Sequence, residues 1–223
     1  MKKSGLKGRL EKLIQDFERA HSNDKDDFER GFNSIRRHLK RHSLAKNEFK
    51  ELNAHYQNGK KKKDTRMHAY HFGRLILEFA HNKSYRHDKE TRKRVMRIAN
   101  NVLEEIFDTI TKNGCRPSGD IRQICLETMV SIPQYNGATY EGESVTIALV
   151  DYLCDKIKDN KTNSEKEKNF RIHGIEALGR LYSKLRKSER ESVKEAMQYV
   201  LDNKKDYAPI EARLAKSVIK KRT

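Results

Sequence analysis

The 223-residue sequence lacks tryptophan altogether and contains only three prolines, eleven glycines and three cysteines. Few prolines and glycines leave little material for the turns of a sheet protein and favour long helices joined by short connections. The cysteines are Cys115, Cys125 and Cys154, an odd number without a CxxC pair. The sequence therefore predicts no disulfide framework and favours the cytoplasm or another reducing intracellular compartment.

Long hydrophobic runs are also missing. No window approaches the roughly 18 apolar residues of a membrane-spanning helix. The first segment includes basic side chains but lacks the apolar run of a secretory signal, so we predict no signal peptide. Hydrophobic residues make up 35% of the chain and charged residues 36%, a balance that would suit disorder. The apolar residues nevertheless recur in amphipathic blocks, which predicts a folded chain.

Apolar residues recur at spacings of three and four along almost the whole chain, which is the period of an amphipathic helix. The pairs Ser164–Glu167 and Ser188–Glu191 place a hydroxyl and a carboxylate three residues apart and predict capping boxes at two helix starts. Residues 134–143 are a turn-rich connector. We predict an all-α fold of about ten helices, each antiparallel to its neighbour, and no strand.

Positive charge is concentrated in the first part of the chain. Of a formal net charge of +17, residues 1–100 carry most, with 27 Lys and Arg against 13 Asp and Glu. Residues 101–223 hold 22 against 19 and are nearly neutral. A one-sided positive field raises the local concentration of polyanions and speeds their capture, so we predict that the first half binds a polyanion.

Three clusters of basic residues carry this prediction. Two are expected on helices, where side chains four residues apart share a face, and one in a mobile loop. The candidate binding residues are Arg36, Arg37, Lys40 and Arg41 on the first helix, Lys60, Lys61, Lys62 and Lys63 in the loop, and Arg92, Lys93, Arg94 and Arg97 on the second helix. We expect the Arg36–Arg41 cluster to lie opposite the apolar stripe of its helix and to form a fixed patch. The alternative interpretation is that these clusters are ordinary solvated surface, which is the usual role of a lysine-rich helix face.

Three tyrosines lie between the basic clusters in the sequence. Tyr56, Tyr70 and Tyr85 are placed where they could stack on nucleic-acid bases.

Two histidine pairs have the spacing that puts both rings on one helix face. They are His38 with His42 and His68 with His71. Zinc needs three or four ligands, and the Arg and Lys neighbours repel a cation, so we predict no metal site. We expect surface histidines that gain positive charge below about pH 6.5.

No catalytic motif is present: the sequence has no nucleophile elbow, P-loop or GxGxxG turn. Cys115 lies beside Arg116, which could lower its pKa, but one such thiol is a weak signal. We predict a chain that is not an enzyme and holds no cofactor. A helical enzyme without recognisable motifs stays open as an alternative.

The segment Phe170-Arg-Ile-His-Gly-Ile-Glu-Ala-Leu-Gly179 resembles the second half of a HEAT-type repeat, in which an apolar residue and an arginine precede small residues and Ala-Leu-Gly. Residues 121–129 are a looser match, and Ile210 follows Phe170 by forty residues, near the repeat length. The resemblance covers about residues 118–223. It implies a right-handed HEAT/ARM-like α-solenoid that binds partners along one face and rarely catalyses.

Among HEAT-like proteins, the HEAT-like DNA glycosylases are basic, all-helical and near this length. They are associated with Trp-lined clefts and a catalytic Asp, and this chain has no tryptophan. A glycosylase is therefore only a minor alternative.

Together these observations predict a non-catalytic helical interaction module. A basic half over 1–113 binds a polyanion, with nucleic acid favoured over an acidic protein or a membrane surface. A HEAT-like half over 114–223 completes the chain, unless the two form one continuous domain. The alternative is a protein–protein scaffold, such as a bacterial effector, that holds another protein on its helical surface; the oligomeric state is open.

Overall fold

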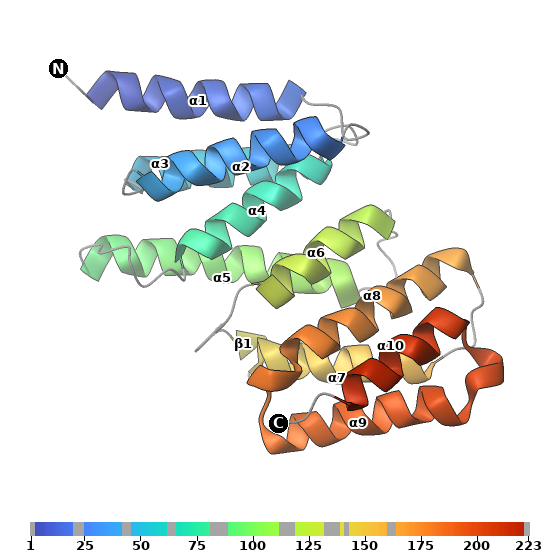
Figure 1. The fold of residues 1–223 in the computed structure, drawn as a ribbon. Coiled ribbons are helices and arrows are strands. Elements are labelled where there is room, and N and C mark those ends of the chain that lie inside the picture. Colours follow the sequence, from blue (N-terminus) through green and yellow to red (C-terminus); the bar gives the residue numbers. More distant parts are fainter. Residues whose placement is uncertain are drawn as a thin grey trace. The chain divides into compact units, whose positions relative to one another are not determined.

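The computed structural model describes residues 3–19, 25–41, 46–61, 66–80, 89–111, 119–131, 139–140, 143–159 and 164–220. Over these residues the protein is all-α, as predicted, with ten α-helices and two short 3₁₀ turns, η1 and η2 (Figure 1). The helices are α1 Lys3–Arg19, α2 Lys25–Arg41, α3 Lys46–Gly59, α4 Arg66–Ala80, α5 Lys89–Thr111, α6 Gly119–Ser131, α7 Val145–Lys158, α8 Glu165–Leu181, α9 Lys187–Asp202 and α10 Pro209–Ile219. The turns are η1 Tyr182–Lys184 and η2 Lys204–Asp206.

One small departure from the prediction lies within the connector before α7. Thr139–Tyr140 (β1) and Glu143–Ser144 (β2) form a two-residue antiparallel ladder in which Thr139 faces Ser144. The ladder leads directly into α7. It was not predicted because two-residue strands leave no alternation of apolar and polar residues to detect.

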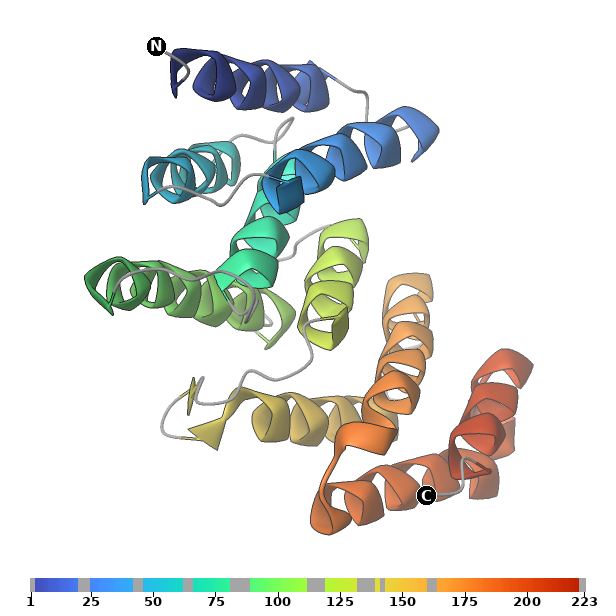
Figure 2. The ribbon, with the colours of Figure 1, turned by 60° about the vertical axis from the view of Figure 1, so that its left-hand side comes forward.

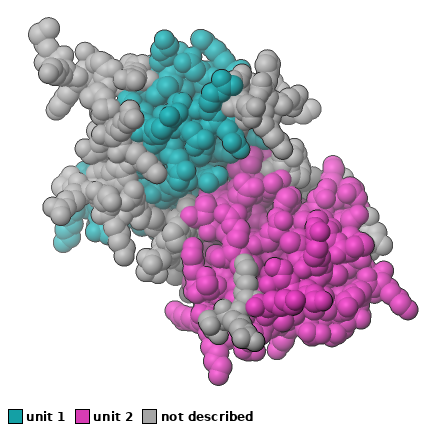
Figure 3. All heavy atoms as spheres, in the orientation of Figure 1, with its two compact units in different colours: residues 1–106 teal, residues 107–223 magenta. Residues whose placement is uncertain are grey.

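The chain divides into two compact units, residues 1–106 and 107–223 (Figure 3). Helix α5 begins in the first unit and its last residues belong to the second. The division predicted after residue 113 stays a prediction.

In the first unit, α1 packs against α2 and α3 against α4. The core contains an aromatic cluster in which Phe17 of α1 contacts Phe72 of α4, with ring centroids 5.5 Å apart and the rings nearly perpendicular. Gly73 lets the helices approach closely, because a Cβ at this position would lie 3.0 Å from a ring carbon of Tyr56. Tyr56 is itself fully buried. The helices of this unit therefore pack through rings rather than through aliphatic side chains alone.

In the second unit, α7 packs against α8, α9 against α10, α6 and α10 against α8, and α7 against α9 (Figure 2). Its core is largely aliphatic, with Leu149, Leu153, Ile175 and Leu178 all at most 1% exposed.

Side-chain bonds join helices that lie two apart in the sequence, in both units. In the first unit His55 of α3 bonds Glu18 of α1 at 2.7 Å, and Arg36 of α2 bonds Glu78 of α4 at 2.7 Å. In the second unit the hydroxyl of Tyr152 on α7 donates to the Ile110 carbonyl of α5 at 3.0 Å. The same relation links α3 with α5, α6 with α8 and α8 with α10.

The two predicted capping boxes have different outcomes. At α8 the Ser164 hydroxyl accepts the backbone N–H of Glu167 at 3.3 Å, which is one of the two bonds of the predicted box. The Glu167 carboxylate accepts from Arg122 of α6 at 3.3 Å. At α9 the prediction of Ser188 with Glu191 is wrong. The helix begins two residues earlier, and the carboxylate of Glu189 accepts the backbone N–H of Arg186 at 2.6 Å. Leu185, which precedes this start, is buried.

Candidate polyanion interface and a charged pocket

The first two turns of α5 carry the most exposed of the predicted basic clusters. Arg92, Lys93, Arg94 and Arg97 are all exposed, and Lys89 joins them at the start of the helix. Val95 and Ala99 are buried and hold the helix against the rest of the first unit. None of these cations forms an ion pair with a carboxylate in the described part of the chain. The α5 face, as we call these five side chains, is therefore available to an external anion.

The basic cluster on α2 is only partly exposed and unpaired. The prediction that Arg36 lies opposite the apolar stripe is wrong. Arg36 lies at the edge of the stripe, where its guanidinium donates to Glu78 of α4. Glu78 also accepts from Arg74 at 3.1 Å. Arg37 is exposed and donates to the Asn33 carbonyl one turn earlier. The side chains of Lys40 and Arg41 lie outside the described residues. Arg36 thus has a structural partner, which reduces the charge that this helix offers.

The predicted mobile lysine loop begins in a fixed position. Lys60 follows directly on α3, and its ammonium donates to Glu105 of α5 at 2.5 Å. It also lies over the ring of Tyr56, 5.1 Å from the centroid. Lys61 is exposed, and Lys62 and Lys63 lie outside the described residues. The expectation of a flexible cation is therefore wrong for Lys60, because the acidic residue on α5 holds it.

The prediction that tyrosines stack on bases is wrong for two of its three residues. Tyr56 is fully buried and Tyr70 is 8% exposed. Their rings contact each other, with centroids 6.1 Å apart at 82°. Tyr85 lies outside the described residues. Both rings fill the space between α3 and α4, so neither is available to a ligand.

The predicted surface histidines are buried. His38 is 6% and His68 4% exposed, and the ring of His68 lies 5.0 Å from that of Phe17. His71 is mostly covered, and burial, with smaller contributions from Arg74 and His68, lowers its pKa to about 3. The ring of His71 therefore stays neutral near pH 7. His42 lies outside the described residues.

His55, which the sequence did not single out, behaves in the opposite way. Its hydrogen bond to Glu18 raises its pKa above the ordinary value, against a smaller effect of burial. The raised pKa favours the charged form of this ring.

The described cysteines are enclosed rather than reactive. Cys125 and Cys154 are buried free thiols, and burial raises the pKa of both, that of Cys154 to about 12. Cys115, the thiol with a basic neighbour, lies outside the described residues. No group of three or more His, Cys, Asp and Glu side chains placed to hold a metal occurs among the residues that the structure describes.

A second concentration of positive charge escaped the sequence analysis. The connection from α8 to α9 carries five basic residues and one acidic residue between positions 180 and 190. We call this the α8–α9 corner and define it by Arg180, Lys184, Arg186, Lys187 and Arg190. Summing charge over residues 101–223 concealed it, because the acids of the flanking helices balance it. A window of about ten residues would have found it.

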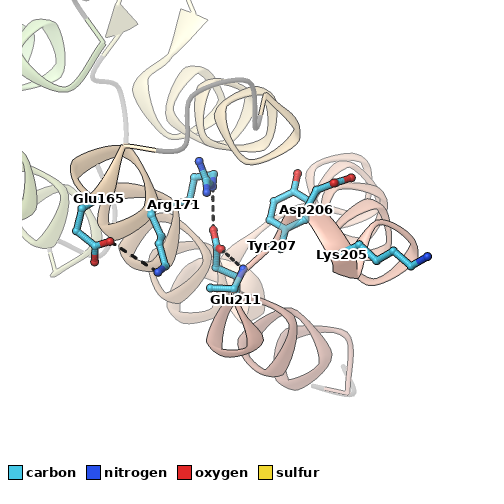
Figure 4. Close-up of a pocket in the computed structure, with 8 residues that line it drawn as sticks. Glu165, Arg171, Lys205, Asp206, Tyr207 and Glu211 are labelled. Carbon is cyan, nitrogen blue, oxygen red and sulfur yellow. Dashed lines mark hydrogen bonds and ion pairs between the residues drawn. The ribbon is translucent and has the colours of Figure 1, made fainter.

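A polar pocket of about 400 Å³ lies in the second unit between α8 and the start of α10. Figure 4 shows its lining side chains. Arg171 of α8 donates to Glu211 of α10 at 2.8 Å, and both side chains are almost inaccessible to solvent, at 4% and 0%. Arg171 also lies 5.8 Å from the ring centroid of Tyr207.

The charges of this pocket are used within the protein. Glu211 also accepts the backbone N–H of Ala208 at 2.7 Å and so caps α10. The hydroxyl of Tyr207 donates to the Ile157 carbonyl at 2.6 Å, and burial is the main cause that raises its pKa to about 12. At the rim Lys168 pairs with Glu165 at 3.7 Å. The pocket is therefore chiefly a junction that fixes α10 against α8.

Nothing matches the chain in comparisons with protein-family models, curated proteins and solved structures. Among the described residues, none of the helices is both long and apolar enough to span a membrane.

Proposed function

We propose that the protein is a non-catalytic interaction module that binds a polyanion, nucleic acid in preference to others, through the α5 face. The observation that carries the proposal is the set of five exposed cations at the start of α5, none of them paired within the described residues. Only Glu90 adds an exposed carboxylate to this stretch.

The position of these cations on the helix is unfavourable in the isolated protein. The first turns of a helix carry partial positive charge, so cations there are repelled, each by a few tenths of a kcal/mol or more. Arg94 and Arg97, and Lys93 and Arg97, are also like-charged neighbours on one face. A row of phosphates would relieve both repulsions at once, and released counterions would add to the affinity.

We further propose that the helices form a right-handed HEAT/ARM-like α-solenoid, at least over residues 118–223. The bonds between helices two apart support this proposal, because stacked helix pairs place each helix against the second one after it. Arg122 of α6 bonds Glu167 of α8, and Arg171 of α8 bonds Glu211 of α10. These two links span 45 and 40 residues, close to the length of one such repeat.

The test replaces Arg92, Arg94 and Arg97 together by glutamine and measures binding of a labelled nucleic-acid duplex by fluorescence anisotropy over a series of salt concentrations. Each phosphate contact contributes about 0.9 to the slope of log affinity against log salt. We expect the slope of the triple variant to fall by two to three, and the affinity at moderate salt to fall at least about tenfold.

The matched control removes the same charge elsewhere, in the variant Lys204→Gln, Arg213→Gln, Lys216→Gln. All three side chains are exposed on the second unit, and none of them belongs to the α8–α9 corner. Equal affinity of the two variants would reduce the effect to net charge and would reject the α5 face. Retention of a protein partner by both variants, without binding of the duplex, would favour the scaffold alternative.

A further inference from the structure

We infer that the α8–α9 corner is a second contact surface for the phosphate backbone of a nucleic-acid duplex, so that each unit carries one cationic contact. The inference rests on the proposed function, since it assumes that the chain binds nucleic acid. It goes beyond it by assigning a role to the second unit, whose overall charge is nearly neutral.

The corner presents its charge outward. Arg180, Lys184, Arg186 and Lys187 are exposed, and none is paired with a carboxylate of the described residues. Two carboxylates lie close by in sequence, and both have other partners. Glu189 is buried and accepts the backbone N–H of Arg186, and Glu191 pairs with Lys194 at 3.2 Å.

The backbone beneath these cations is held in place. Arg190 donates to the carbonyl of Leu185 at 2.8 Å and to that of Ser183 at 3.5 Å, which ties the η1 turn to α9. Its guanidinium also lies 5.9 Å from the ring centroid of Tyr182. Leu185 and Tyr182 are each 3% exposed. A cationic surface on a fixed backbone loses less conformational entropy on binding than a flexible lysine tail would.

The chemistry of the corner fits a duplex backbone better than other polyanions. Membrane-surface binding uses apolar or aromatic side chains inserted beside the basic ones, whereas Tyr182 and Leu185 point into the core. Binding of single strands uses exposed rings on which bases stack. The corner offers guanidinium and ammonium groups at the first turn of α9, and these are the groups that contact phosphates without reading sequence.

The experiment uses the full chain with Lys184→Gln, Arg186→Gln and Lys187→Gln, and omits Arg190 because it supports the turn. The control variant at Lys204, Arg213 and Lys216 matches it in the number of lysines and arginines removed. Both are compared with the α5 triple variant on labelled duplexes of unrelated sequence. We expect the corner variant to lose roughly tenfold in affinity and about two in salt slope, equally for all sequences. Circular dichroism of each variant confirms that the helices are retained.

The outcomes separate this inference from the proposed function. If the corner variant binds like the control while the α5 variant is weakened, the inference is overturned and the α5 face stands. If only the corner variant is weakened, the α5 proposal fails and the corner carries the binding. Loss of binding to anionic phospholipid vesicles with unchanged duplex binding would also overturn the inference, as would a strong preference for single strands.

Discussion

Within each unit, side-chain bonds link a helix to the second helix after it in the sequence. The two units use different side chains for these bonds. The first unit uses ion pairs that keep partial contact with water, such as Arg36–Glu78, whose side chains are 36% and 14% exposed. The second unit places one pair, Arg171–Glu211, almost completely out of water. It also uses tyrosine hydroxyls on helix-end carbonyls, from Tyr152 and Tyr207.

The two units also differ in the side chains that fill their cores. The first unit encloses imidazoles among aromatic rings, and the ring of His71 lies 5.1 Å from that of Phe32. The core of the second unit is largely aliphatic, and the pair Arg171–Glu211 is buried beside a polar pocket. The comparison leads to different expectations for stability. The stability of the first unit should depend on pH through its buried imidazoles, and that of the second should depend on keeping both charges of one buried ion pair.

The largest expected effect is in the second unit, from Glu211→Ala. The change leaves the Arg171 guanidinium buried without its carboxylate and removes the cap of α10. Removing one partner of a buried pair costs about 3–5 kcal/mol. Urea denaturation followed by circular dichroism measures the loss.

The exposed Glu195→Ala on α9 is the control and should change the free energy of unfolding by less than about 0.5 kcal/mol. A cost for Glu211→Ala within that range would show that the pair contributes nothing. The double variant Arg171→Met, Glu211→Leu should recover much of the loss, because it removes both buried charges together.

The next effect is in the first unit and appears on acidification. The folded pKa of His71 is about 3, below the ordinary 6.5, so the unfolded chain binds the proton first. This contribution to stability is complete above pH 6.5 and is lost as the pH falls from 6.5 towards 3. The slope approaches about 1.4 kcal/mol per pH unit. Urea midpoints at pH 7, 6 and 5 measure it.

Replacing His71 by phenylalanine should flatten this dependence, whereas His173→Gln on the partly exposed surface of α8 should leave it unchanged. His55 acts in the opposite direction. Its raised pKa contributes stability below pH 6.5 that is lost as the pH rises through the folded value. An unchanged pH profile in the His71 variant would contradict the assignment.

The smallest effect compares two helix glycines, one in each unit. At Gly73 an added Cβ would lie 3.0 Å from Tyr56 and 3.3 Å from Ile106, both buried. Overpacking of this kind costs about 1–3 kcal/mol. At Gly174 the nearest atom is a methyl of Leu153 at 3.4 Å, so alanine should fit and gain up to about 1 kcal/mol from helix propensity. Thermal melts of Gly73→Ala and Gly174→Ala should therefore shift in opposite directions.

The helices could be predicted because their apolar residues follow one period and because capping residues such as Ser164 act locally. The burial of His68 and His71 could not be predicted, since the rings that contact them, Phe17 on α1 and Phe32 on α2, lie about 40 to 50 residues earlier in the sequence. The same holds for Arg36, whose partner Glu78 lies on another helix.

The candidate sites show the same limit. The exposure of Lys93 and Arg97 on α5 could be predicted from the helix period, because both lie away from the buried Val95 and Ala99. The fixed position of Lys60 depends on Glu105, which no local pattern connects to it. The α8–α9 corner could have been detected from the sequence. Charge summed over more than a hundred residues does not reveal five basic residues within a stretch of eleven positions.

The side-chain links between helices have a consequence for how the chain folds. Those between helices two apart span only 37 to 48 residues each. Each can form as soon as its second helix leaves the ribosome, without waiting for the end of the chain. The first unit can therefore complete its links while the second is still being synthesised, and assembly can follow the direction of translation.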